Sequence, residues 1–180
     1  MNNAINTRRI ALTALFTAAS LILSFVQIPI FPAAPWLMYD PSGIVCLIVA
    51  LAFGPRMGAA VAVASWLPRV FLDPFGAPMG IVSTCALVIP AALVFETGRR
   101  TRKASIVGML LGGAISTALA CALNLVVTPL YTAVTMQDVA AMILPVLLPF
   151  NLLKMVINIA AGQALLEPCL NVLRANGEHE

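Results

Sequence analysis

Apolar stretches of about twenty residues recur along this chain, separated by short segments rich in proline, glycine or charge. A helix of that length crosses the hydrocarbon core of a bilayer, which is about 30 Å thick. The stretches lack the alternating pattern of membrane barrel strands. Only 9% of the 180 residues are charged and the mean hydropathy is +1.00, whereas soluble domains have about 25% charged residues. The sequence therefore predicts an all-α, polytopic membrane protein embedded in a lipid bilayer.

Proline and glycine divide the chain into six predicted transmembrane helices. Their expected ranges are 10–28, 43–53, 56–72, 79–96, 105–128 and 145–167. No composition shift marks a second domain, so we expect one transmembrane domain over residues 1–180, with a disordered tail at about 175–180.

Prolines are expected to shape these helices because proline lacks a backbone N–H and clashes with the preceding turn. Pro68 should bend the third helix, Pro129 should end the fifth, and Glu167-Pro168 should end the sixth. Residues 136–144 are too short to span a membrane and are expected to form an interfacial helix.

The basic residues predict the orientation. With the N-terminus inside, the cytoplasmic segments would hold eight of the ten lysines and arginines: Arg8, Arg9, Arg56, Arg99, Arg100, Arg102, Lys103 and Arg174. The outer loops would hold Asp40, Asp73 and Asp138 and no basic residue. By the positive-inside rule, both termini are predicted to be cytoplasmic. Arg69, in a predicted span, is expected to reach the headgroups or pair with Asp73.

A short polar ladder interrupts the last apolar segment. Asn151, Lys154 and Asn158 are three and seven positions apart, so on a helix they share one stripe. A charge near a bilayer centre costs about 2.5–3.5 kcal/mol on insertion scales, and an intramembrane lysine therefore indicates a functional site. The predicted site is a pocket in the outer half of the membrane. The alternative is that Lys154 extends to the outer headgroups.

Two other places carry candidate site residues. Asn124 lies in the outer half of the fifth predicted helix, where it can contact a ligand or form an interhelical hydrogen bond. The first outer loop carries Trp36, Tyr39 and Asp40 among prolines. It can act as a lid over a flat ligand or belong to an interfacial aromatic belt, and Asp40 or Ser42 can cap the second helix.

Small residues line one side of the first predicted helix. Ala14 and Ala18 are four positions apart and make a flat strip that another helix can approach closely. The partner can be a helix of the same chain or of another protein.

Together, these features resemble a known family. Six predicted helices, the Ala14-x-x-x-Ala18 strip, the Tyr39-Asp40-x-Ser42 loop and Pro149-x-Asn151-x-x-Lys154 resemble the substrate-binding S components of energy-coupling factor (ECF) vitamin transporters, and most of all their riboflavin-specific group. The resemblance covers essentially the whole chain. It implies a multi-pass protein of the prokaryotic plasma membrane that binds a vitamin from outside with high affinity.

The resemblance also implies partners and site roles. The S component would dock, through the alanine strip, on a shared transmembrane coupling subunit that is joined to two cytoplasmic ATPases. Asn124, Asn151 and Lys154 would contact the flavin ring, and the first loop would close over it. The chain departs from the riboflavin-specific pattern at Gly43, where an acidic residue usually follows the loop serine. An S component for another vitamin or vitamin-like solute is therefore an alternative.

Other functions find little support in the residues. The four cysteines are isolated, the single histidine is His179 in the polar tail, and no catalytic dyad is visible, which disfavours a small membrane enzyme and a metal site. A stand-alone carrier is a further alternative. The chain has no G-x-x-x-x-G-K-[ST] loop for ATP, so any energy for transport would have to come from partners. A net charge of +3 is too small to indicate nucleic acid. We expect no cofactor, with riboflavin as transported ligand only.

Overall fold

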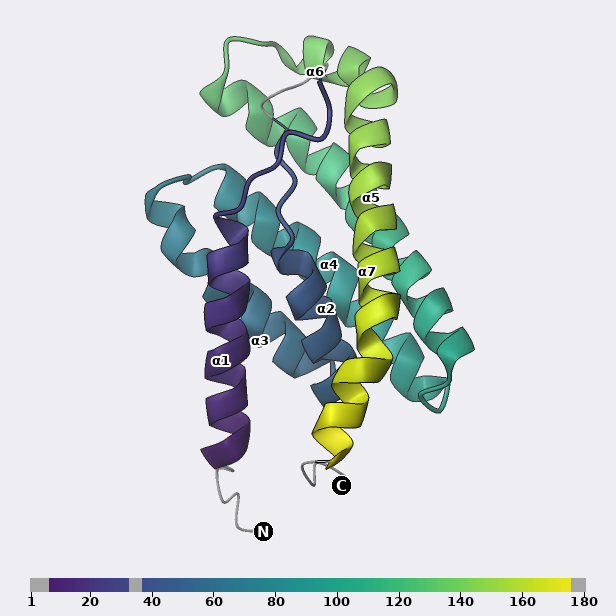
Figure 1. Ribbon diagram of the computed structural model, residues 1–180. Coiled ribbons are helices and arrows are strands. Elements are labelled where there is room, and N and C mark those ends of the chain that lie inside the picture. The colour runs from purple at the N-terminus through teal and green to yellow at the C-terminus, as the bar shows by residue number, and fades with distance from the viewer. Residues whose placement is uncertain (1–6, 33–36, 176–180) are drawn as a thin grey trace.

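The computed structural model describes residues 7–32 and 37–175. Within these ranges the regular structure is helical, with no strand (Figure 1). The α-helices are α1 (Thr7–Ser24), α2 (Ser42–Phe53), α3 (Pro55–Trp66), α4 (Gly76–Thr97), α5 (Arg102–Tyr131), α6 (Met136–Met142) and α7 (Leu148–Ala175). A 3-10 segment, η1 (Leu67–Phe71), follows α3, and a π segment, η2 (Ile143–Leu147), joins α6 to α7. The predicted all-α class is confirmed.

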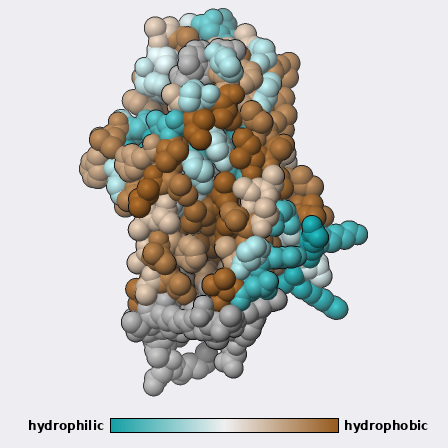
Figure 2. Space-filling view, in the orientation of Figure 1, coloured by the Kyte–Doolittle hydropathy of each residue, from teal (hydrophilic) through white to brown (hydrophobic). Residues whose placement is uncertain are grey.

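Three helical stretches of the described chain are long and apolar enough to cross a membrane: Gly76–Thr97, Arg102–Tyr131 and Met136–Val172. The apolar helices Ile10–Ser24 and Ser42–Phe53 are shorter, at 10–17 residues. Figure 2 shows hydrophobic side chains over most of the middle of one face, with hydrophilic ones near the top and around the α4–α5 turn at the lower right. This pattern fits a bundle whose middle faces lipid.

Two predicted helix ends are wrong. Pro129 lies inside α5, where the backbone N–H of Thr132 still donates to the Thr128 carbonyl at 3.1 Å. Pro168 likewise lies inside α7. Membrane helices tolerate proline because neighbouring helices and Ser or Thr side chains can satisfy the freed backbone groups. At Pro68 the expected distortion occurs, because α3 ends at Trp66 and a 3-10 segment follows.

The predicted short helix before the last span is present as α6, but no loop separates it from α7. A capping box at Thr135 and Asp138 starts α6, with the Asp138 carboxylate accepting from the Thr135 backbone N–H at 2.8 Å. From there the helix continues through η2 into α7, giving one helical stretch, Met136–Val172. A π segment adjusts the backbone hydrogen bonds locally instead of ending the helix.

The short helix α2 lies at the centre of the bundle, against α1, α3, α4 and α7. Leu47, Val49 and Leu51 are fully buried there, so this helix meets protein on most sides. Around it, α4 and α5 approach closely at Gly112, which has no Cβ. A Cβ at this position would lie only 2.1 Å from the Leu87 carbonyl oxygen. Figure 1 shows this core in the half of the bundle where α1 begins and α7 ends, while α5 and α7 extend beyond it.

Candidate ligand-binding site

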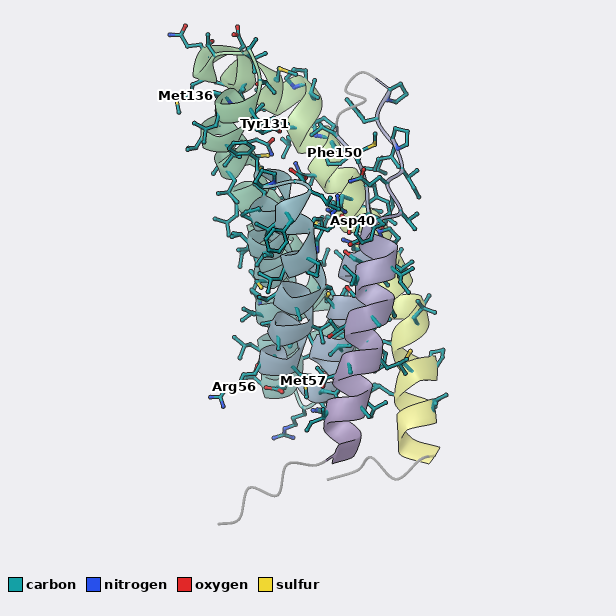
Figure 3. All side chains as sticks on the ribbon, turned by 90° about the vertical axis from the view of Figure 1, so that its left-hand side faces the viewer. Asp40, Arg56, Met57, Tyr131, Met136 and Phe150 are labelled. Atoms are coloured by element: carbon teal, nitrogen blue, oxygen red, sulfur yellow. The ribbon has the colours of Figure 1, made fainter. Side chains whose placement is uncertain are left out.

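A cavity of about 450 Å³ lies in the half of the bundle beyond the N-terminus of α2. Its walls come from the first loop, the end of α3 with η1, the start of α4, the end of α5 and the start of α7. Figure 3 shows the wall residues Asp40, Tyr131 and Phe150 in the half away from Arg56 and Met57. The volume falls within the range of about 300–1,000 Å³ that is typical of small-molecule pockets.

The α7 wall carries an amide and an ammonium group. Asn151 and Lys154 line the cavity, while Leu152 and Leu153 between them are exposed on the outside of the bundle. This is the stripe that the three-residue spacing predicts. The Asn151 side-chain N–H donates to the Leu147 carbonyl at the end of η2, at 2.8 Å. That bond fixes the amide and leaves its oxygen available as an acceptor.

Lys154 forms an ion pair across the bundle. Its Nζ lies 3.2 Å from Oδ2 of Asp40, and the two side chains are 23% and 6% exposed. Ser42 donates a further hydrogen bond to the other Asp40 oxygen. Lys154 therefore points into the protein and not toward the headgroups. Asp40 is held by Lys154 of α7 and by Ser42 at the start of α2. It does not cap α2, which has no side-chain cap.

Asn158, one turn further along α7, has a different position. It accepts a hydrogen bond from the Tyr39 hydroxyl at 3.0 Å and lines a narrow inner recess of about 20 Å³. A Cβ on Gly43 would lie 3.2 Å from the Asn158 amide nitrogen. Glycine at this position, where riboflavin-specific relatives were expected to carry an acid, thus lets α2 and α7 approach closely.

The first loop is anchored to the helices through Tyr39. Its backbone pairs with Ile28 in both directions, at 2.8 and 2.9 Å, and its side chain is buried. Burial, and to a lesser degree the charge of Asp40, raise the pKa of Tyr39 from 10.0 to about 12. The hydroxyl therefore remains a donor to Asn158 at physiological pH. Trp36, the other aromatic residue predicted here, lies outside the described residues.

Asn124 lines the cavity from α5. Its side-chain N–H donates to the Ala120 carbonyl at 2.8 Å, and its oxygen accepts from the Thr128 hydroxyl at 3.0 Å. Both bonds stay within α5, so the predicted alternative of an interhelical hydrogen bond is not what the described structure shows. Asn124, Asn151, Lys154 and Asp40 share one cavity. Asn158 lines the narrow inner recess instead, and its hydrogen bond with Tyr39 anchors the first loop.

Ala14 and Ala18 are far from the cavity lining, on α1, and both are exposed. They are not covered by the described part of the chain, so this strip is available to lipid or to another protein.

Sequence reasoning missed the wall formed by α3, η1 and the turn to α4. Trp66, Arg69 and Asp73 line the cavity there. The expected pair between Arg69 and Asp73 is absent from the described structure, in which Lys154–Asp40 is the observed ion pair. Arg69 carried the same signal as Lys154, a charge inside an apolar span, but its place near a predicted helix end suggested contact with headgroups.

Comparison with known proteins defines the class. Residues 8–161 match the family model of the ECF transporter substrate-specific component. The chain therefore belongs to the family of ECF transporter S components, and the resemblance seen in its motifs is confirmed. It is a transporter component and not an enzyme.

Two curated relatives are both named riboflavin transporter RibU. The Streptococcus thermophilus protein is 28% identical over 93% of this chain and 85% of its own length. The Staphylococcus aureus protein is 26% identical over 82% of each. A solved structure, described as "Structure and mechanism of the S component of a bacterial ECF transporter", shares the fold with a TM-score of 0.79, at 24% identity over 93% of this chain and 98% of that one.

Proposed function

We propose that this chain is the high-affinity riboflavin-binding S component of an ECF-type importer in a prokaryotic plasma membrane. The observation that carries the proposal is the convergence of Asn124, Asn151 and Lys154, from two helices, on one 450 Å³ cavity. The names of the two relatives support riboflavin as the vitamin.

The chemistry of the cavity suits a flavin. One edge of the isoalloxazine ring alternates carbonyl acceptors with an N–H donor. The Asn151 oxygen can accept from that N–H, and the Lys154 ammonium can donate to a ring carbonyl. Phe150 and Tyr131 line the same cavity and offer faces on which a flat ring can pack.

The proposed orientation has six spans, with both termini in the cytoplasm and the cavity open to the outside. The basic α4–α5 turn lies at the end of the bundle where α1 begins and α7 ends (Figure 1), which supports this orientation by the positive-inside rule. Because S components work with a shared transmembrane subunit and ATPases, we place docking of the coupling subunit at Ala14 and Ala18 and energy supply at two cytoplasmic ATPases.

Titration of the purified protein with riboflavin tests the proposal directly. We expect the flavin fluorescence to be quenched on binding, with a one-to-one endpoint. Thiamine and biotin, added in excess, should not displace the bound flavin. Absence of quenching would exclude riboflavin, and displacement by another vitamin would identify the alternative S component.

A further inference from the structure

Arg69 is a buried cation whose environment is short of acceptors. Its side chain, in η1, is 6% exposed and lines the cavity. One Nη donates to the Ser24 carbonyl at the end of α1. The guanidinium carbon lies 4.9 Å from the Trp66 ring centroid and 5.5 Å from that of Phe25. These contacts hold the planar group in place but leave its remaining N–H groups without a protein acceptor among the described residues.

The neighbouring groups do not supply the missing acceptor. The indole N–H of Trp66 is itself buried without a hydrogen-bond partner in the described structure. The Asp73 carboxylate accepts from the Gly76 backbone N–H at 2.7 Å, at the start of α4, and does not pair with Arg69. This wall therefore has a surplus of donors, which native proteins rarely leave unsatisfied.

The part of the cavity wall that carries Arg69 also lies apart from the Lys154–Asp40 ion pair, which is the other charged part of the cavity. Figure 1 places the turn from α3 to α4, where η1 lies, at the left edge of the bundle and α7 at the right. On the α7 wall, the Lys154 charge is already balanced by Asp40. A flavin whose ring edge faces Asn151 and Lys154 carries its ribityl chain on the central ring, and that chain needs partners on another part of the wall.

From this arrangement we infer that Arg69 is a further ligand-binding residue, whose guanidinium binds the oxygen-rich chain attached to the flavin ring. The inference rests on the proposed function. The shared chemistry is an oxygen acceptor, which can be a ribityl hydroxyl or a terminal phosphate ester. A guanidinium suits both, because its donors lie in a fixed plane and remain charged at all physiological pH values.

A purely structural role for Arg69 predicts a different result. A cation is also favourable at the C-terminal end of a helix, and the contact with Ser24 ends α1 in this way. If that were its whole role, replacing Arg69 would affect every ligand equally through the stability of the fold.

Ligands with and without the ribityl chain separate a ligand-binding role of Arg69 from a purely structural one. Riboflavin, riboflavin 5′-phosphate and lumichrome, which is the ring without a ribityl chain, should be titrated into the unmodified protein, Arg69→Met and Arg69→Lys. We expect Arg69→Met to weaken riboflavin binding by about 5- to 150-fold with little change for lumichrome. Arg69→Lys should retain part of the preference for riboflavin. Because the preference is a ratio within one preparation, it does not depend on the folded fraction.

Arg56→Met is the matched control, since Arg56 lies on α3 but is exposed at the opposite end of the bundle (Figure 3). It should leave all affinities unchanged.

The pattern of losses in Arg69→Met identifies the acceptor. A larger loss of affinity for the phosphate ester than for riboflavin would identify the phosphate, and equal losses would identify the hydroxyls. Equal losses for lumichrome and riboflavin would overturn the inference. If the unmodified protein bound none of the three ligands, the proposed function itself would fail.

Discussion

Lys154 of α7 and Asp40 of the first loop form a 3.2 Å ion pair although 114 positions separate them in the chain. Both side chains line the same cavity. The pair therefore ties the loop before α2 to the helix that carries Asn151, and a ligand that contacts Lys154 acts on a group that also positions the loop. Removing one partner leaves the other as a poorly compensated charge.

A double-mutant cycle should reveal this coupling. Asp40→Asn and Lys154→Met should each lower the thermal stability of the purified protein. The double variant should be more stable than the two separate losses imply, with a coupling energy of about 0.5–3 kcal/mol, toward the lower end because Lys154 is 23% exposed. Unfolding in detergent, followed by circular dichroism, measures it. Strictly additive losses would contradict a stabilising pair.

Lys154→Met should weaken riboflavin binding by about 5- to 150-fold, the range for a ligand group left without its partner. Methionine keeps most of the stem and removes the charge. Lys103→Met is the control, because Lys103 is exposed in the first turn of α5 and should have no effect. Fluorescence titration of Lys154→Met in the Asp40→Asn background separates loss of a ligand contact from loss of the ion pair. Unchanged affinity there would remove the lysine from the site.

Asn151→Ala should weaken riboflavin binding over the same range, since the Asn151 oxygen is the acceptor proposed for the ring N–H. Leu152→Ala, at the exposed neighbouring position, should leave the affinity unaltered. The same titration compares them. Equal behaviour of the two variants would mean that the amide serves only its hydrogen bond to Leu147.

The hydrogen bond from Tyr39 to Asn158 predicts a pH dependence. Tyr39→Phe should cost about 0.5–1.5 kcal/mol of stability near neutral pH. The pKa of Tyr39 is about 12 in the folded protein, whereas the usual pKa of tyrosine is 10.0. Above about pH 10 the unfolded chain therefore binds fewer protons than the folded protein, and the free energy of unfolding falls as the pH rises.

Near-ultraviolet absorbance of tyrosinate measures this titration. We expect a late step that is present in the unmodified protein and missing from Tyr39→Phe. Stability should fall above pH 10 more steeply in the unmodified protein than in the variant. A tyrosinate spectrum unchanged by Tyr39→Phe throughout the late step would show that Tyr39 is not buried as described.

The helices could be predicted from the sequence because lipid-facing residues must be apolar over a whole span. Their ends could not always be predicted, because proline ends a helix only where its missing N–H is not tolerated. That condition depends on neighbours: Pro129 and Pro168 remain inside α5 and α7, whereas Pro68 marks the change to η1.

The candidate site was predictable only where its geometry is local to one helix. Spacing along one helix places Asn151 and Lys154 on one face, so that stripe follows from local geometry. The pairing of Lys154 with Asp40 depends on how the first loop folds over α2, which no local pattern encodes. Arg69 was visible as a charge in a span, but only the position of Trp66 and the end of α1 shows that it faces inward.

Single cysteines test the orientation. In a background without the native four, Gln137→Cys should react with an impermeant thiol reagent added to intact cells, and Arg102→Cys should not. Both positions are exposed, and Gln137 is preferable to Asp138 because Asp138 belongs to the capping box of α6. Permeabilised cells are the control, in which Arg102→Cys should also react. The reverse pattern would place the cavity on the cytoplasmic side.

Leucines at Ala14 and Ala18 should separate binding from transport. Both alanines are exposed on α1, so added bulk blocks the close approach of another helix without reaching the cavity. The double variant should bind riboflavin normally in detergent but fail to take up labelled riboflavin in cells that contain the energising subunits. Retained uptake would exclude docking at this strip.

A matched pair on α5 controls for the effect of bulk in a membrane helix. Ala118 and Ala122 are also exposed and four positions apart, and their replacement by leucine should alter neither binding nor uptake. The comparison is informative because both double variants add the same volume to a lipid-facing stripe, and only their positions differ. If binding and expression of the α1 variant collapsed together while the α5 variant stayed normal, the strip would serve the packing of this chain and the docking proposal would fail.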